Sequence, residues 1–412
     1  MNWILCELGV AMPVSRNLAI GLVVIVAVIV VAAAFLLTMQ PAGGETVKIG
    51  LIAPLTGSLA EHGLDMKQAA ILAVDEINSK GGILGRKIEL VIEDTACKAD
   101  LATAAVQKLI TQDKVYAVVG EYCSTVTLAV QPTLMENKKL LLVPVSVATK
   151  ITEQGYKYTA RSCANQWMQT TQHADFIVSQ LKPKTAAMLG VNDDYGREGL
   201  KIWGDRVKEK GVRIVAEEYF DAGTTDFTPQ LSKIKAANPD VIFVVANIRD
   251  AANILKQAHE IGLYKQFSML GGVTSEEFLQ LAGDDAIGLV HVSYFEPTSK
   301  RPAAQEFVQK FVQRWNRMPA MYSAGVWDAF MTLKYAVEKA GTWDVDKVAD
   351  AIRTIRFEGA QGTIYYDEKG QAQTKVLLVQ VQKVDGKLKR VILYPESDKE
   401  GEYIPPERLW GS

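Results

Sequence analysis

The sequence predicts an α/β protein built from two consecutive parallel-sheet lobes. Short, almost continuously apolar runs alternate with helical stretches across residues 47–294, a pattern typical of parallel strands covered by helices on both faces. Roughly eight such units are too many for one mononucleotide-type fold, and they fit two lobes of four or five strands each. The chain has 412 residues, 48% of them apolar and 22% charged, which is enough to form two cores.

The individual strand predictions follow the apolar runs. The first strand, Val47–Leu55, leads through a turn into a helix whose apolar residues between Met66 and Ile77 share one face. Gly81 and Gly82 end that helix. Further buried strands are expected over Ile88–Ile92, Val115–Val119, Leu140–Val147, Ala186–Val191, Val212–Ala216, Val241–Ala246, Phe267–Leu270 and Leu289–Tyr294.

The last part of the chain departs from this alternation. Three helices are expected in succession, over Arg301–Arg317, Tyr322–Ala340 and Val345–Ile355. A β-rich tail follows, in which Asp385-Gly386 is a hairpin turn signal. We expect this tail to return and complete the lobes begun earlier.

An uncharged segment precedes the first strand. No charged residue lies between Arg16 and Glu45, and Leu18–Met39 is a run of 22 residues in which only Thr38 is polar. At about 1.5 Å per residue this run can cross a hydrocarbon core about 30 Å thick. It is longer than the apolar core of a typical signal peptide, and no cysteine follows it to accept a lipid. We expect residues 1–45 to be an uncleaved membrane anchor, with a cleaved signal as the alternative, and the remainder to be exported.

Composition and motifs argue against several other classes of protein. Lys plus Arg total 45 and Asp plus Glu total 47, with no long run of one sign, so nucleic-acid binding is not expected. The cysteines and histidines lack the spacing of a metal site. The glycines at 81–85 do not form a phosphate loop, and Ser124 is not in a nucleophile elbow. The sequence therefore predicts neither an enzyme nor a metal or cofactor.

Two cysteines follow predicted strands in the first half of the chain. Cys97 and Cys123 are expected at the carboxyl edge of the same sheet, on neighbouring strands. In an oxidising compartment they can form a disulfide, and two free thiols are the alternative. Cys163 is expected to be a buried thiol, because no histidine lies near it in the sequence to activate it as a nucleophile.

Hydroxyl-bearing segments follow two of the predicted strands. Ser124-Thr125 comes after the strand at 115–119, and Val145–Thr149 comes after the strand that begins at Leu140. Ligands of open parallel sheets collect at the carboxyl ends of strands, where helix N-termini present N–H groups. These segments therefore predict a carboxylate site without arginine, with simple helix capping as the alternative.

Ordered matches along the chain resemble the branched-chain amino acid binding proteins of ABC transporters, which are type I periplasmic binding proteins. The matches begin with Val47–Leu51, Pro54–Gly57 and Ala73–Asn78 and continue to Asp367, so that the resemblance covers residues 46 to about 395. It implies two lobes, 46–165 plus 297–373 and 166–296 plus 374–412, joined by three crossovers and closing like a hinge. It also implies a disulfide between Cys97 and Cys123.

The same resemblance implies a ligand site at nine positions. Ser124 matches a serine that holds the ligand carboxylate, and Val145 matches a position that contributes backbone atoms. Tyr195 matches a pocket tyrosine of the second lobe, while Tyr122 and Tyr322 fall where side chains line the cavity. Four positions depart from the family pattern: Val147 replaces a threonine, His62 and Asn247 replace tyrosines, and Gly271 replaces the acid that pairs with the ligand ammonium.

These expectations define an extracytoplasmic solute-binding component of an ABC uptake transporter, which captures a small amino acid or carboxylate and delivers it to the permease and its ATPase. Because Gly271 cannot pair with an ammonium, either another acid compensates or the ligand lacks that charge. The acids nearest in the chain, Glu121, Asp194 and Glu276, are each expected on the solvated surface. An amide, urea or aromatic-acid binder of the same fold is an alternative, and so is a ligand-sensing receptor ectodomain.

Overall fold

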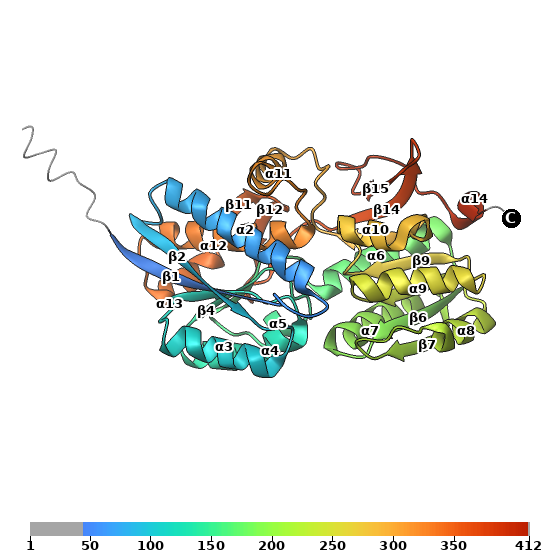
Figure 1. Ribbon diagram of the computed structural model, residues 1–412, viewed down its shortest axis with the longest axis horizontal. Helices are drawn as coiled ribbons and strands as arrows, with labels where there is room; N and C mark the ends of the chain where they lie inside the picture. Colours follow the sequence, from blue (N-terminus) through green and yellow to red (C-terminus); the bar gives the residue numbers. More distant parts are fainter. Residues whose placement is uncertain (1–43, 411–412) are drawn as a thin grey trace, which may run out of the picture. The chain divides into compact units, whose positions relative to one another are not determined.

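The computed structural model describes residues 44–410, which contain a five-stranded, a seven-stranded and a three-stranded sheet (Figure 1). Residues 46–410 belong to one compact unit. The anchor predicted over residues 18–39 lies outside the described residues. Between residues 44 and 410, no helix is both long enough and apolar enough to cross a membrane.

The five-stranded sheet has helices on both faces. Its strands lie in the order β2 (Arg86–Asp94), β1 (Gly44–Ala53), β3 (Ala117–Val119), β4 (Leu140–Val143) and β5 (Thr159–Arg161), and the pairs from β1 to β5 are parallel. Side chains alternate across the sheet, as its pleat requires. Leu140 and Leu142 pack toward α2 (Ala60–Ser79) and α12 (Met321–Ala340), while Leu141 and Val143 pack toward α3 (Ala99–Thr111) and α4 (Ser124–Glu136).

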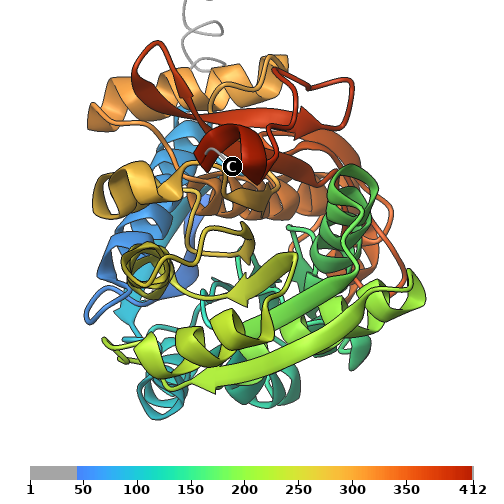
Figure 2. The ribbon, with the colours of Figure 1, turned by 90° about the vertical axis from the view of Figure 1, so that its right-hand side faces the viewer.

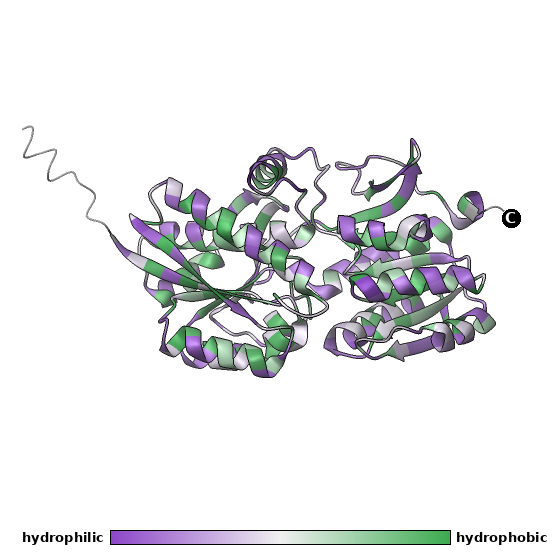
Figure 3. Cartoon of the chain, viewed as in Figure 1, coloured by the Kyte–Doolittle hydropathy of each residue, from purple (hydrophilic) through white to green (hydrophobic). Residues whose placement is uncertain are grey.

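The seven-stranded sheet is parallel over five strands and antiparallel at one edge. Its order is β15 (Lys387–Tyr394), β14 (Leu377–Val384), β10 (Val290–Ser293), β9 (Gln266–Leu270), β8 (Val241–Val245), β6 (Thr185–Val191) and β7 (Arg213–Phe220). One face packs on α8 (Thr228–Ala237), α9 (Ile248–Glu260) and α10 (Glu276–Ala282), and the other on α6 (Gln166–Leu181) and α7 (Asp194–Glu209). Figure 3 shows the resulting pattern of hydrophobic strands between helices of mixed hydropathy.

The sequence located most strands and missed one. Each predicted apolar run overlaps a strand, and the predicted helices of the last part correspond to α11 (Pro302–Trp315), α12 and α13 (Val345–Ile352). The Asp385-Gly386 hairpin is confirmed, since Val384 pairs with Lys387 across it. In the second sheet, which the sequence predicted as parallel, β14 of this returning tail runs antiparallel to β10, and β15 runs antiparallel to β14. The strand that was missed, β5, reads Thr-Ala-Arg and carries no apolar signal.

The small sheet consists of β11 (Arg356–Gly359), β12 (Gly362–Tyr366) and β13 (Ala372–Gln373). In three passages, the chain leaves the five-stranded sheet after β5, leaves the seven-stranded sheet after β10, and returns to the seven-stranded sheet after β13. Arg161, which is fully buried, ties the first and third passages together. Its Nε donates to Gln371 Oε1 at 2.7 Å, and its Nη1 donates to the carbonyl of Ala148 at 2.7 Å. The exact division of the chain into two lobes stays a prediction.

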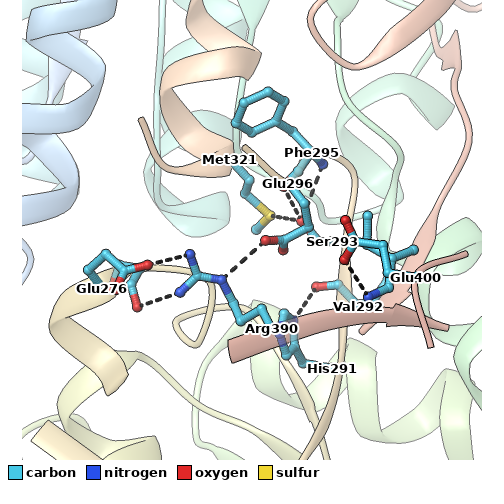
Figure 4. Close-up of polar contacts among 11 residues, drawn as sticks. Glu276, His291, Val292, Ser293, Phe295, Glu296, Met321, Arg390 and Glu400 are labelled. Carbon is cyan, nitrogen blue, oxygen red and sulfur yellow. Dashed lines mark hydrogen bonds and ion pairs between the residues drawn. The ribbon is translucent and has the colours of Figure 1, made fainter. Parts of the chain in front are cut away.

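The second passage is held by a buried ion pair (Figure 4). Glu296 follows β10, and its Oε2 lies 3.1 Å from Nε of Arg390 on β15. Arg390 also contacts Glu276 of α10 at 2.8 Å. The side chains of Glu296 and Arg390 are 2% and 8% exposed, so this pair fixes the segment that leaves the seven-stranded sheet.

The end of the chain returns to the same sheet (Figure 2). Gln380 and Gln382 of β14 donate to the carbonyls of Ile404 and Glu402, both at 2.8 Å, and Tyr403 donates to Gln266 at 2.7 Å. The short helix α14 (Pro406–Trp410) follows. The tail therefore completes the seven-stranded sheet, as the sequence predicted.

Candidate functional site

The predicted ligand residues lie at the carboxyl ends of strands in both large sheets. Ser124 begins α4 after β3, and Val145 and Val147 follow β4. In the seven-stranded sheet, Tyr195 follows β6 at the start of α7, Asn247 follows β8, and Gly271 follows β9 directly. In each sheet, the parallel strands have their carboxyl ends at the same edge of that sheet. Open α/β sheets bind ligands at this carboxyl edge.

Three aromatic side chains from separate elements pack together at this edge. The ring of His62, from α2, stacks on Tyr122 at 4.9 Å between centroids, and it meets Tyr322, from the start of α12, edge-on at 4.8 Å. The Tyr122 and Tyr322 hydroxyl oxygens lie 3.4 Å apart. His62 is fully buried, and burial lowers its pKa to about 4, so the ring is neutral at pH 7. Neither of its ring nitrogens has a hydrogen-bond partner.

Tyr195 and Gly271 meet on the side of the seven-stranded sheet. A Cβ atom placed on Gly271 would lie 2.2 Å from the Tyr195 hydroxyl oxygen, so this hydroxyl occupies the space that a side chain at position 271 would need. Gly271 also has φ of +67°, a conformation that favours glycine. The Tyr195 hydroxyl oxygen is buried and has no hydrogen-bond partner.

Ser124 stands at the N-terminus of α4 and is 4% exposed. Its hydroxyl oxygen accepts a hydrogen bond from the Ala148 N–H at 3.2 Å, which joins the loops after β3 and β4. The hydroxyl proton remains available to donate, and the helix N-terminus favours a negative charge beside it. This arrangement suits a carboxylate oxygen, and Ser124 is not a capping residue, because Cys123 occupies the N-cap position.

Polar contacts join the loops of the two large sheets around these residues. Thr125, next to Ser124, donates to Asp194 at 2.9 Å, and the Thr149 N–H donates to Glu198 of α7 at 2.9 Å. Gln166, at the start of α6, donates to the carbonyl of Tyr195 at 2.7 Å. Residues that follow strands of the two sheets therefore contact one another beside the predicted ligand residues.

The remaining predicted residues, Val145, Val147 and Asn247, make other contacts. Val145 and Val147 pack into the core beside α12, and the Val147 carbonyl accepts from the Gln166 N–H at 2.8 Å. Asn247 is half-buried at the N-cap of α9, without a side-chain capping bond. Sequence reasoning missed Gln166 and Tyr294, each of which has a buried polar atom without a partner. Neither residue stands in a motif, and only the packing reveals it.

One of the three acids expected on the surface is instead buried. The Glu121 side chain turns inward, where it accepts from the Thr95 hydroxyl at 2.5 Å and from the Cys123 N–H. Burial raises the pKa of this carboxyl to about 7. Asp194 and Glu276 are exposed as predicted. Glu121 was misjudged because a polar residue directly after a strand gives no sign of the neighbouring loop that covers it.

Cys97 and Cys123 are joined by a disulfide, with their Cα atoms 5.8 Å apart. Both lie at the carboxyl edge of the five-stranded sheet, but their strands are not neighbours as predicted, because β1 lies between β2 and β3. Cys163 is fully buried as predicted, and burial raises its pKa to about 12. Within residues 44–410, no three His, Cys, Asp or Glu side chains are grouped to hold a metal ion.

The fold is α/β, and the predicted ligand residues lie at strand ends of two sheets. A family model described as periplasmic binding protein matches residues 46–387. The leucine-, isoleucine-, valine-, threonine- and alanine-binding protein of Pseudomonas aeruginosa is 31% identical over 329 residues, which cover 79% of this chain and 87% of that protein.

Solved structures give the same result. A leucine binding protein from Thermotoga maritima matches with a TM-score of 0.79 at 29% identity, covering 85% of this chain and 100% of that one. An ABC transporter solute binding protein from Rhodopseudomonas palustris BisB5, solved with 3,4-dihydroxybenzoic acid, matches with a TM-score of 0.77 at 26% identity, covering 88% and 98%. The chain therefore belongs to the periplasmic binding protein family, and its α/β fold is the type I fold of that family.

Proposed function

We propose that this chain is the extracytoplasmic solute-binding component of an ABC uptake transporter. It captures a small ligand that carries a carboxylate, an amino acid or a related acid, and it performs no chemical step. The observation that carries this proposal is Ser124, whose buried hydroxyl stands at the N-terminus of α4, where a negative charge is favoured. The P. aeruginosa relative is named for the amino acids it binds, which supports the ligand class.

Ligand capture follows from how the loops meet. In this proposal the lobes are residues 46–165 plus 297–373 and residues 166–296 plus 374–412, and bending at the three passages brings them together. Thr125 with Asp194, and Thr149 with Glu198, are contacts that exist only when the loops approach. A ligand that binds both sets of loops shifts the population toward the closed form. The closed protein then delivers the ligand to the permease and its ATPase.

The location outside the cytoplasm is supported by the disulfide and by the N-terminal segment. A disulfide persists in an oxidising compartment such as the periplasm. The uncharged run Leu18–Met39 is long enough to serve as a membrane anchor for the exported part. In this proposal residues 1–45 hold the protein at the outer face of the membrane.

A thermal-shift screen of the full chain in mild detergent tests the function. Amino acids, aromatic acids, amides and polyols are added in turn, and one ligand class should raise the melting temperature. A ligand at 100 times its dissociation constant stabilises the protein by about 2.7 kcal/mol. X-ray scattering of the best hit should show a smaller radius of gyration. If no carboxylate stabilises the chain, or if a bound compound is chemically converted, the proposal is wrong.

A further inference from the structure

The groups around the Tyr122 hydroxyl are neutral hydrogen-bonding groups and aromatic rings, whereas Asp65 acts on Tyr322 and Asp193 acts on Tyr195. The ionisable groups that act most strongly on the Tyr122 hydroxyl are three other tyrosines, Tyr322, Tyr195 and Tyr294. His62, beside them, is neutral, because burial holds its pKa at about 4. Each hydroxyl can donate or accept one hydrogen bond without bringing a charge into the site.

Three acidic side chains near these residues are engaged in other contacts. Glu121 is bound to Thr95 and to the Cys123 N–H. Asp193, two residues before Tyr195, caps α7 by accepting from the Gly196 N–H at 2.9 Å. Asp65, one turn after His62, is paired with Arg317. A buried ammonium would have to recruit an acid from one of these contacts or reach Glu277 of α10, which has one buried oxygen without a partner. Burying the ammonium unpaired is strongly unfavourable.

Position 271 excludes an acid of its own. The Tyr195 hydroxyl fills the space above the Gly271 Cα, and the positive φ of Gly271 adds strain to any side chain there. The buried Tyr195 hydroxyl lacks a partner, as do both ring nitrogens of His62. Buried polar groups in proteins are nearly always hydrogen-bonded, so we expect these atoms to form hydrogen bonds with a ligand or with water.

We propose that the ligand is an aromatic monocarboxylate without an ammonium group. This inference rests on the proposed function, in which the carboxylate binds at Ser124. The ring lies against the cluster of His62, Tyr122 and Tyr322, where flat rings pack favourably. A hydroxyl group on the ring meets the hydroxyl of Tyr195. Tyr195 and Gly271 together set the specificity, since they put a neutral donor and acceptor where a carboxylate side chain would otherwise stand.

Calorimetry on the full chain in mild detergent tests this with matched ligands. L-Phenylalanine and 3-phenylpropanoate differ only in the ammonium group, and 4-hydroxybenzoate and benzoate differ only in the ring hydroxyl. We expect 3-phenylpropanoate to bind at least tenfold tighter than L-phenylalanine, and 4-hydroxybenzoate tighter than benzoate. Equal or tighter binding of L-phenylalanine, or of L-leucine over both aromatic acids, overturns the inference but leaves the proposed function standing. If none of these carboxylates binds, both fail.

Two variants test the role of the Tyr195 hydroxyl and whether a buried acid pairs with the ligand. Tyr195→Phe should remove the preference for 4-hydroxybenzoate over benzoate, because the ring remains and only the hydroxyl is lost. Glu277→Gln tests the one acid near Asp65 that has a buried oxygen without a partner, since an ammonium would need such an acid. Its affinities should stay within twofold of the wild type. A preference that survives in Tyr195→Phe, or a large loss in Glu277→Gln, contradicts the inference.

Discussion

Replacing Glu121 by glutamine should change how the stability of the protein depends on pH. Burial raises the pKa of the Glu121 carboxyl from 4.5 to about 7 in the folded chain, whereas the unfolded chain keeps the ordinary value. The folded state therefore binds this proton more tightly. The stability that this tighter proton binding contributes is fully present below the pKa that Glu121 has in the unfolded chain. It is lost as the pH rises through about 7. A pKa gap of about 2.5 corresponds to about 3 kcal/mol.

Glutamine keeps both contacts of the buried side chain without a charge. Its carbonyl can accept from the Cys123 N–H, and its amide can donate to the Thr95 hydroxyl oxygen. The free energy of unfolding is measured by urea denaturation of the wild type and of Glu121→Gln at pH 5 and pH 8. From pH 5 to pH 8, the free energy of unfolding of the variant should rise by up to about 3 kcal/mol relative to that of the wild type.

A matched control removes the contribution of all other titrating groups. Glu136→Gln changes an exposed glutamate at the end of α4, and its stability should follow the wild type at both pH values. If the difference between Glu121→Gln and the wild type is the same at pH 5 and pH 8, the argument from burial is wrong.

Three further predictions concern single contacts. Ser124→Ala should weaken ligand binding by about 1–3 kcal/mol, as measured by calorimetry. It should also lower the free energy of unfolding by about 1 kcal/mol, because the Ala148 N–H loses its acceptor. Unchanged ligand affinity would remove Ser124 from the site. Reducing the Cys97–Cys123 disulfide, which spans 26 residues, should lower the free energy of unfolding by about 3.5 kcal/mol by the chain-entropy relation. An identical urea midpoint with and without reductant would show that the bond contributes nothing. Gly325→Ala should destabilise by about 1–3 kcal/mol, because its Cβ would lie 2.3 Å from the Pro144 carbonyl oxygen; a variant as stable as the wild type would mean that α12 shifts freely.

The alternating strands and helices could be predicted from the sequence because burial on both faces of a parallel strand requires an unbroken apolar run. The run Leu140–Val143 and the Asp385-Gly386 turn carry this information in a few adjacent residues. The strand β5 could not be found in this way. Its Arg161 is buried among carbonyl oxygens and the side chain of Gln371, and these partners are distant in sequence.

The order of strands in the sheet is a property of the tertiary structure. The sequence placed Cys97 and Cys123 at one edge, but it could not show that β1 lies between their strands. Glu121 was misjudged for a related reason, since its burial depends on Thr95, which belongs to another loop.

For the candidate site too, the sequence determined some features and the tertiary structure decided others. The sequence by itself determined that Ser124, Tyr195 and Gly271 follow strands, because strand ends are marked by local apolar patterns. Only the tertiary structure decided that the Tyr195 hydroxyl covers Gly271 and that His62, Tyr122 and Tyr322 pack as one cluster. Close packing between residues far apart in the chain depends on how the two sheets and their loops meet, and no local pattern of residues encodes that geometry.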